Sequence, residues 1–365
     1  MRSLERALVD EFIELVSIDA ESGDEAEIAA RVMSKLTEIG LDVEMDDAGS
    51  KFGGNAGNVI GRIGEGDPII LCAHLDRVKP GKGIKPVVDD GIVRSSGDTV
   101  LAADDISGVV AILAGLREAK KHKPLPAVEV IFTVSEETRL QGSRYLDYTR
   151  LRSKMAYIFD ASRPVGTVIT SSPTHVGFEA HVAGQAAHAA VNPQDGVSAI
   201  RAAVFAISKL PFGWVDDHTT TKVGVLSGGA ATNIVCDSVK FKGEIRSLVA
   251  SRASQLANEF TGTIASEAEA HGAKANVMTK VEYSGYAIDP SAPVVVRVVE
   301  ALRRIGIAAT FESTMGGSDG NIFNANGISS VVLGTGCSLV HSTREFILVS
   351  ELMASARLVE SLLTS

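Results

Sequence analysis

The sequence contains few cysteines. Only Cys72, Cys236 and Cys337 occur in 365 residues, and they lie far apart. An odd and scattered count excludes a disulfide framework, and no Cys-x-x-Cys pair offers a zinc site. A reducing compartment is the simple interpretation of this cysteine usage, so we expect a cytoplasmic protein.

Positive charge is scarce relative to negative charge. The chain has 35 Lys and Arg residues against 45 Asp and Glu residues, which gives a net charge of −10. Its isoelectric point is about 5.4. Domains that bind nucleic acid usually have an isoelectric point above about 9, so we expect no nucleic-acid partner. The 45% of apolar residues is ordinary for a globular protein, and the length suggests two domains.

Hydrophobic runs long enough for secretion or membrane insertion are missing. Acidic residues near the start of the chain exclude the apolar region of a signal peptide; they are Glu5, Asp10, Glu11 and Glu14. The uncharged stretch 320–343 is rich in Asn, Ser and Gly, unlike a transmembrane helix. We therefore expect no membrane partner.

Apolar periodicity predicts alternating helices and strands in the first part of the chain. Asp24 and Glu27 have the spacing of a capping box, which would open a helix that ends at Gly40. The uninterrupted apolar run 127–134 is typical of a buried parallel strand. The other predicted helices are 3–17, 105–121 and one near 140–150, and the other strands are 58–63, 69–75 and 156–160. This alternation predicts an α/β domain with a mostly parallel sheet.

The middle of the chain has a different pattern. Strands are predicted at 177–184, 222–228, 239–248 and 276–283, with helices at 197–210 and 251–271. These elements indicate an α+β insertion over 174–285. From Pro290 the α/β rhythm resumes, with a helix, a strand, the loop STMGGSDGN, a strand at 328–334 and a last helix near 350–363. Segments 1–173 and 286–365 are therefore expected to form one domain around the insertion.

Polar residues follow the predicted strands of the α/β part. They are His74 and Asp76, Asp104 and Asp105 before a helix, Glu136 and Glu137, Asp160, and His341. In open α/β sheets the ligand crevice lies beyond the carboxyl ends of the strands. A set of carboxylates with two imidazoles at that edge suits one or two divalent ions such as zinc.

The same residues satisfy the requirements of a two-metal site. Such a site needs a shared carboxylate, terminal ligands on each ion and an unligated base. The inventory allows His74 and Asp160 on one ion, Glu137 and His341 on the other, Asp104 as the bridge, Glu136 as the base and Asp76 as a hydrogen-bond partner of the His74 imidazole.

Each motif alone has a simpler structural interpretation. A pair such as Glu136 and Glu137 usually lies in a solvated turn, and Asp104 with Asp105 most often caps a helix. The His-x-Asp of residues 74–76 is a weak signal by itself. Their shared occurrence at strand ends of one α/β rhythm favours a common site.

The order of nine motifs carries a family resemblance over essentially the whole chain. These are HLD, LAADDISG, TVSEE, IFDAS, GQAAHAA, GGAATNIVCD, GEIRS, GGSDGNIF and VHSTREF. In this order they resemble the peptidase T branch of the co-catalytic dinuclear zinc exopeptidases, which are related to carboxypeptidase G and aminoacylase. The resemblance implies an α/β catalytic domain interrupted by a smaller α+β lid and dimerisation domain, with two divalent ions per chain. Zinc is the first expectation, and cobalt or manganese are alternatives.

The resemblance also implies roles for individual residues. The metal ligands would be His74, Asp104 as the bridge, Glu137, Asp160 and His341, with Asp76 orienting His74 and Glu136 as general base. His188 would reach the active site of the partner subunit in a homodimer and stabilise the oxyanion. Asn233 and Arg246 would hold substrate, with Arg246 gripping a carboxylate. A structural turn, a cap and an ion pair are the simpler interpretations of His188, Asn233 and Arg246.

The sequence departs from the family pattern at three positions. Arg77 stands where Thr is usual, Ala102 where Gly is commoner, and Cys236 where Pro is usual. Arg77 would bring a positive charge near the metal crevice and so bears on side-chain preference. None of these changes removes a ligand or the base.

The expected function is a metal-dependent exopeptidase that acts on short peptides and releases the N-terminal residue of tripeptides. A dipeptidase or an N-acyl-amino-acid amidohydrolase would use the same dinuclear site. A serine hydrolase is a weaker alternative, because Ser318 in GGSDG is followed by only Asp319 as an acid before His341. A non-catalytic scaffold is disfavoured, since every ligand position is occupied.

Overall fold

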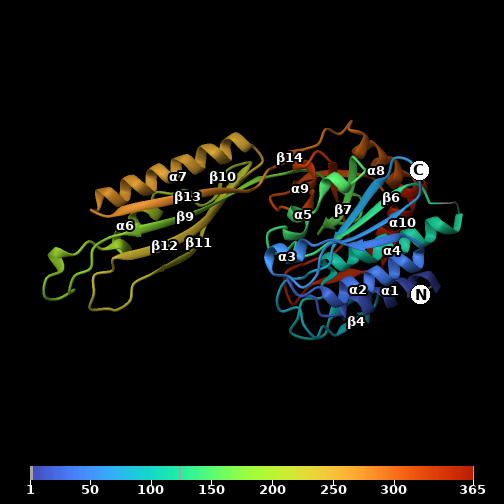
Figure 1. Ribbon diagram of the computed structural model, residues 1–365, viewed down its shortest axis with the longest axis horizontal. Helices are drawn as coiled ribbons and strands as arrows, with labels where there is room; N and C mark the ends of the chain where they lie inside the picture. Colours follow the sequence, from blue (N-terminus) through green and yellow to red (C-terminus); the bar gives the residue numbers. More distant parts are fainter. Residues whose placement is uncertain (1–2, 123–124, 365) are drawn as a thin grey trace. The chain divides into compact units, whose positions relative to one another are not determined.

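The computed structural model describes residues 3–122 and 125–364 (Figure 1). The chain forms two compact units. The larger unit comprises 1–170, 287–313 and 318–365, and the smaller unit comprises 171–286 and 314–317. The expected division placed 314–317 with the catalytic segments. This short segment instead packs on the smaller unit, where the Ser172 hydroxyl donates to the Gly316 carbonyl over 2.9 Å.

The larger unit is built on a nine-stranded sheet with the order β1-β2-β6-β3-β7-β16-β8-β14, and β15 also pairs with β8. The strands are β1 (Asp42–Met45), β2 (Val59–Ile63), β3 (Ile69–His74), β6 (Val128–Thr133), β7 (Met155–Ala161), β8 (Thr167–Ser172), β14 (Tyr286–Ala287), β15 (Thr310–Ser313) and β16 (Ser329–Gly334). The central strands β6, β3, β7 and β16 are parallel. On the flanks, β1, β2 and β8 pair antiparallel. The parallel strands end at the same edge of the sheet.

Helices cover both faces of this sheet. They are α1 (Ser3–Val16), α2 (Ala26–Ile39), α3 (Ala48–Phe52), α4 (Ala103–His122), α5 (Gln141–Tyr145), α8 (Pro293–Arg304), α9 (Asp319–Ala325) and α10 (Val349–Thr364). Successive residues of β3 point to two hydrophobic cores. Ile69 and Leu71 pack in the core shared with α1, α2, α4, α8 and α10, whereas Ile70 and Cys72 face the core that contains Phe323 of α9.

Short elements beside the central sheet escaped the sequence analysis. The strands β4 (Pro86–Asp89), β5 (Ile92–Ser95) and β17 (Phe346–Leu348) form a separate three-stranded sheet. Helix α9 begins inside the predicted loop STMGGSDGN, where the Ser318 hydroxyl accepts from Gly320 N and Ser318 N donates to Asn321 Oδ1. Ser318 is thus a helix cap, which further weakens its interpretation as a nucleophile.

The predicted capping box at the start of α2 is wrong. The N-cap residue is Glu25, whose side chain makes no capping hydrogen bond. Asp24 instead accepts from Asn55 Nδ2 over 2.8 Å and pairs with Lys82. Asn55 Oδ1 accepts from the free backbone N–H of Ala26 over 3.0 Å. The helix ends at Gly40 with a φ of 101°, as expected for a glycine C-cap.

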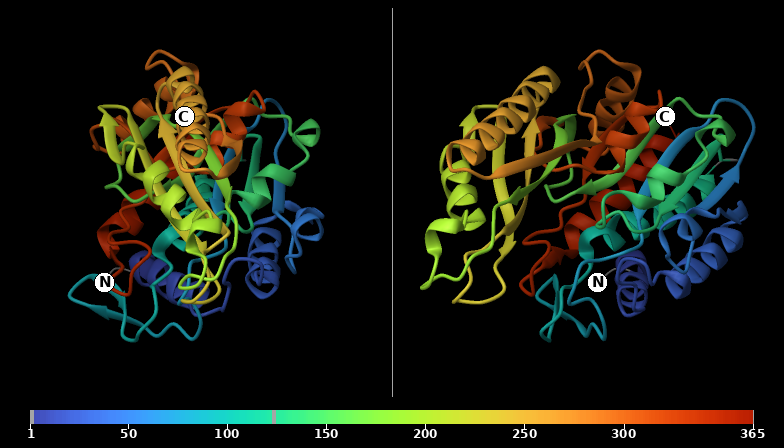
Figure 2. Two further views of the ribbon diagram at one scale, coloured as in Figure 1. Left: turned by 90° about the vertical axis from the view of Figure 1, so that its left-hand side faces the viewer. Right: turned by 60° about the vertical axis from the view of Figure 1, so that its left-hand side comes forward.

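The smaller unit is a five-stranded antiparallel sheet with two helices on one face. The sheet order is β10-β11-β12-β9-β13, and Figure 2 shows α7 lying along the sheet. The elements are β9 (Thr174–Ala183), α6 (Ala199–Ser208), β10 (Gly213–Asp216), β11 (Thr219–Gly228), β12 (Ser238–Ser247), α7 (Ala250–Ala270) and β13 (Lys274–Tyr283). Alternate residues of β9, such as Phe178 and Ala180, enter the core under the helices.

One edge of this sheet is partly open. Strand β10 pairs only with residues 219–221 of β11. Along the rest of β11, the described part of the chain supplies no outer neighbour. The side chains of Val225 and Leu226 in this open stretch are 56% and 55% exposed. Within 3–122 and 125–364, no helix has the length and apolar character of a membrane span.

Because Asn55 completes the start of α2, we expect Asn55→Ala to lower the free energy of unfolding by about 1 kcal/mol, the usual value of a cap. Glu27→Ala should change it by less than about 0.5 kcal/mol, the usual limit for an exposed position without special contacts. Urea unfolding of both variants measures the two effects. If Glu27→Ala lost more unfolding free energy than Asn55→Ala, the capping box of Asp24 and Glu27 would be supported instead.

Candidate metal centre

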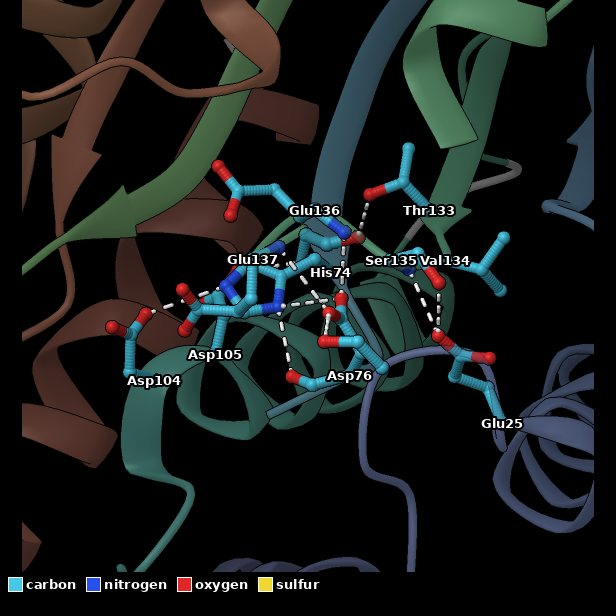
Figure 3. A network of polar contacts seen from close by, with 12 residues as sticks. Glu25, His74, Asp76, Asp104, Asp105, Thr133, Val134, Ser135, Glu136 and Glu137 are labelled. Atoms are coloured by element: carbon cyan, nitrogen blue, oxygen red, sulfur yellow. Dashed lines mark hydrogen bonds and ion pairs between the residues drawn. The ribbon is translucent and has the colours of Figure 1, made fainter. Parts of the chain in front are cut away.

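Five predicted ligands meet at the carboxyl edge of the parallel strands, and Figure 3 shows three of them, His74, Asp104 and Glu137. His74 ends β3, Glu137 follows β6, and Asp160 lies near the end of β7. Asp104 and Asp105 have non-helical backbone angles at the start of α4, so regular helix begins after them. His341 comes from the loop between β16 and β17 and has a φ of 58°. Neighbouring parallel strands thus bring together residues that are far apart in sequence.

The Asp104 carboxylate lies between the two histidines. Its Oδ1 is 3.4 Å from His74 Nε2, and its Oδ2 is 3.2 Å from His341 Nε2. Each histidine also contacts a second carboxylate. Asp160 Oδ1 is 3.6 Å from His74 Nε2, and Glu137 Oε1 is 2.8 Å from His341 Nε2. This arrangement has the pairing that the two-metal interpretation of the sequence requires.

Ligand atoms of His74, Asp104, Asp105, Glu137 and Asp160 converge in two groups, each within 4.8 Å, and His341 belongs to neither group. One group contains His74, Asp104 and Glu137, and the other contains His74, Asp105 and Asp160. Oxygen ligands combined with imidazole nitrogens fit divalent ions of the zinc, cobalt and manganese class. The donor set therefore fits the metals that the sequence analysis expected, although its second group includes Asp105 as an additional carboxylate.

The electrostatics of the site favour a bound cation. Burial raises the pKa of Asp160 to about 7, and it also raises the pKa of Glu137. Burial opposes ionisation of Asp104 as well, but hydrogen bonds from His341 and His74 bring its pKa below the ordinary value. Hydrogen bonds to Asp104 and Glu137 raise the pKa of His341 to about 10. Positive charge is thus drawn to this cluster of buried carboxylates.

Asp76 has more contacts than the sequence predicted. His74 Nδ1 is 3.0 Å from the backbone carbonyl of Asp76 and 3.4 Å from its carboxylate Oδ1. The same fully buried carboxylate accepts from Glu136 N over 2.8 Å and from Glu137 N over 3.2 Å. Asp76 therefore both orients the imidazole and holds the turn after β6.

Glu136 lies beside the cluster but belongs to neither ligand group. Burial, followed by the nearby negative charge of Asp160, raises the pKa of Glu136 well above its ordinary value. A carboxyl group with a raised pKa is a better proton acceptor for catalysis near neutral pH. This environment is suitable for a general base.

The sequence analysis missed the role of Glu345. Its buried carboxylate accepts from Leu101 N, Ala102 N and Asp104 N over 2.8, 2.9 and 3.0 Å. Ala102 has a φ of 61°, a left-handed conformation that is uncommon for a residue with a side chain. Glu345 thus holds the loop that presents Asp104. The only sequence signal for Glu345 was its place in the VHSTREF motif. No pattern of neighbouring residues links Glu345 to residues 101–104.

The predicted substrate-binding residues lie in the smaller unit. His188 is exposed in a loop, and its Nδ1 accepts from Ala190 N and Val191 N over 3.2 Å. Exposed Asn233 lies beside it, since its carbonyl accepts from Ala189 N. Arg246 donates to the Met315 carbonyl over 3.1 Å and pairs with Glu244 over 3.2 Å. The roles of His188, Asn233 and Arg246 stay predictions.

Arg77 is buried and contacts the end of a helix. Its buried guanidinium donates to the Val16 carbonyl over 2.7 Å at the end of α1. Burial lowers the pKa of Arg77 to about 10. A positive charge here stabilises the negative end of the helix dipole. The bearing of Arg77 on side-chain preference stays a prediction.

Comparisons with known proteins place the chain in a family. The sequence pattern of Peptidase family M20/M25/M40 matches residues 70–365. The uncharacterized protein YqjE of Bacillus subtilis is 36% identical, with 98% of both chains covered. The crystal structure of aminopeptidase PepT from Bacillus cereus has a TM-score of 0.91 at 37% identity, covering 98% of each chain. That of a tripeptidase from Staphylococcus aureus has a TM-score of 0.94 at 36% identity, covering 98% of this chain and 97% of the other.

Removal of bound cations by a chelator should lower the melting temperature, because repulsion among the buried carboxylates is then uncompensated. Zinc at 100 times its Kd should restore about 2.7 kcal/mol of unfolding free energy. Asp104→Asn should bind fewer zinc ions and show a smaller shift. Thermal unfolding and metal analysis of the same samples measure both effects.

Asp67→Asn serves as the matched control, since Asp67 is an exposed aspartate in the turn between β2 and β3. It should respond to zinc as the wild type does. An equal zinc response in the wild type and in Asp104→Asn would contradict the assignment of Asp104 as a shared ligand.

Proposed function

We propose a specific reaction on the premise that the chain belongs to Peptidase family M20/M25/M40 and is a peptidase. The proposed reaction is metal-dependent hydrolysis of short peptides with release of the N-terminal residue of tripeptides. One observation carries this proposal: the Asp104 carboxylate lies between His74 and His341, with one oxygen near each imidazole. A carboxylate in this position supports a ligand shared by two ions.

The proposed ligands divide into two sets around Asp104. His74 and Asp160 would hold one ion, and Glu137 and His341 the other. When bound there, two divalent ions lower the pKa of a shared water and polarise the scissile carbonyl. Zinc is the proposed ion, with cobalt and manganese as alternatives of similar ligand preference.

Glu136 is the proposed proton carrier. Its carboxylate would accept a proton from the attacking water and return it to the nitrogen of the leaving amine. Burial raises the pKa of Glu136, which favours the protonated form that would serve as the acid. Asp76 supports this role, because it fixes the backbone N–H of Glu136.

His188 is the proposed oxyanion donor. Because its Nδ1 accepts two backbone hydrogen bonds, the neutral ring carries its proton on Nε2. An exposed Nε2–H can donate to the oxygen that becomes negative in the transition state. We assign this donor to the active site of the partner subunit, as the family resemblance implies. Arg246 would bind the carboxylate of a short peptide, and Asn233 would contact its backbone.

The open edge of β11 supports a homodimer through the smaller unit. Unpaired strand edges with apolar side chains readily pair with another chain, and here Val225 and Leu226 are exposed. Further apolar side chains are exposed on α6, namely Ile200, Val204 and Phe205. Pairing of two copies along this edge would cover both surfaces.

Leu226→Lys should therefore favour the monomer, because it places a charge in the proposed interface. The kcat should fall with dimer content if His188 acts across the interface. Met278→Lys is the matched control, since Met278 is 60% exposed on β13 at the opposite edge. Analytical ultracentrifugation and assays over a range of protein concentrations measure both properties. If the monomer were fully active, His188 of the partner subunit would have no role in catalysis.

The substrate class is tested by hydrolysis of a peptide panel with chelator-treated protein, with and without added Zn²⁺, Co²⁺ or Mn²⁺. Names of the solved relatives, an aminopeptidase and a tripeptidase, support tripeptides as the first substrates. Metal-restored release of the N-terminal residue is the expected result. Preference for dipeptides or for N-acetyl amino acids would move the assignment to a dipeptidase or an amidohydrolase with the same site.

In the same assay, Glu136→Gln should bind two ions per chain but lose roughly 10²- to 10⁴-fold in kcat, the usual contribution of a general acid–base group. The amide has the size of the carboxyl group and cannot carry the proton. Wild-type kcat in this variant would show that Glu136 is not the base.

A further inference from the structure

The turn that carries Glu136 has an unfavourable backbone conformation. Ser135, directly before Glu136, has a φ of 50°. A residue with a side chain rarely adopts this left-handed conformation. Such a conformation persists only where surrounding contacts hold it, and it often lies at functional sites. The contacts of Ser135 therefore determine how Glu136 enters the site.

Glu25 supplies those contacts from a distant part of the chain (Figure 3). Its Oε1 accepts from Ser135 N over 3.0 Å and from the Ser135 hydroxyl over 2.7 Å. The two residues are 110 positions apart in sequence. Glu25 is completely buried. The same Oε1 also accepts from Gly23 N over 2.8 Å.

Three consecutive backbone N–H groups thus donate to buried carboxylates. Ser135 N donates to Glu25, while Glu136 N and Glu137 N donate to Asp76. Hydrogen bonds to charged acceptors are stronger than those between neutral groups. The two carboxylates together hold the backbone from which the side chains of Glu136 and Glu137 extend.

We propose that Glu25 is a positioning residue for Glu136, acting through the left-handed turn at Ser135. The inference rests on the proposed function of Glu136 as the base. A purely structural role, in which Glu25 joins the segment before α2 to the sheet, would affect stability alone. A positioning role affects kcat, because a misplacement of about 1 Å at a catalytic group can cost about 10²-fold in rate.

The contacts of Glu25 allow a conservative test. Within the described residues, the hydrogen bonds of the Glu25 carboxylate end on Oε1, and Oε2 has no partner. Glutamine retains one carbonyl oxygen, so Glu25→Gln can keep every bond. Leucine has a similar size but no acceptor, so Glu25→Leu leaves both donors of Ser135 unpaired.

We expect Glu25→Leu to lower kcat by about 10²-fold with a change in KM of less than about threefold. It should still bind two metal ions per chain. Glu25→Gln should retain kcat within about threefold of the wild type. Both variants are assayed as the metal-loaded protein well below their melting temperatures, so that unfolding does not contribute. Wild-type kcat in folded Glu25→Leu, or equal loss in both variants, would overturn the proposal.

Ser135→Ala tests the same contact without altering Glu25. It removes the hydroxyl donor and keeps the backbone N–H, so kcat should fall by less than in Glu25→Leu. In the Glu25→Leu background the same change should have little further effect, since the acceptor is already gone. Independent, multiplicative effects in this double-mutant cycle would contradict the coupling. Ser135→Ala and Glu25→Gln also preserve the test if Glu25→Leu does not fold.

Glu129→Leu controls for the general loss of a buried carboxylate. Glu129 is fully buried near the start of β6 and accepts from Arg152 N and Ser153 N over 3.1 and 3.0 Å. This variant should lower the melting temperature and leave kcat unchanged. A kcat loss equal to that of Glu25→Leu would assign the effect to destabilisation and overturn the proposal.

Failure of the proposed function gives a different pattern. If the wild type shows no metal-dependent cleavage, or if Glu136→Gln keeps its kcat, Glu136 is not the base and the role of Glu25 is overturned with it. If Glu136→Gln is inactive while Glu25→Leu is folded and fully active, only the inference on Glu25 is wrong.

Discussion

The burial of several carboxylates at one edge of a parallel sheet is the constraint on which the site depends. An isolated buried charge is strongly unfavourable, yet Asp104, Glu137 and Asp160 are brought together in this region. Two histidines, His74 and His341, offset part of this repulsion. The remaining negative charge favours the binding of divalent cations. The arrangement that lowers the stability of the fold therefore also forms the candidate metal site.

A second set of carboxylates holds the loops that carry the first. Glu345 binds the backbone before Asp104, and Glu25 binds the backbone before Glu136. In both loops a residue with a side chain has a positive φ, Ala102 in one and Ser135 in the other. Buried acceptors and left-handed residues thus occur together immediately before two residues of the site. Each strained turn is stabilised by an acid that lies elsewhere in the sequence.

The smaller unit follows different physical rules. Its sheet is antiparallel and buries one face under α6 and α7, which explains the alternating pattern of strands such as β9. The exposed loop with His188 presents polar groups at the surface of this unit. The open edge of β11 presents apolar side chains there. We proposed that these groups bind substrate and a second copy of the chain, whereas the candidate metal ligands lie in the larger unit.

Much of the fold was predictable because its signals are local. The apolar run of β6, the alternation of β9 and the glycine that ends α2 each reflect the environment of adjacent residues. Polar residues at the ends of successive strands also predicted which side chains would gather, since parallel strands end at one edge. Contacts between distant segments were not predictable. The cap that Asn55 provides to α2 and the burial of Arg77 against α1 are examples.

The sequence by itself determined the α/β rhythm, the inserted α+β segment and the candidate ligands. These features depend on periodicity and on the order of motifs along the chain. Only the tertiary structure decided which acids hold the site loops. Glu25 reaches Ser135 across 110 positions, and Glu345 reaches the loop before Asp104 across more than 240. Sheet formation must bring such segments together before their hydrogen bonds can form, so no pattern of neighbouring residues specifies them.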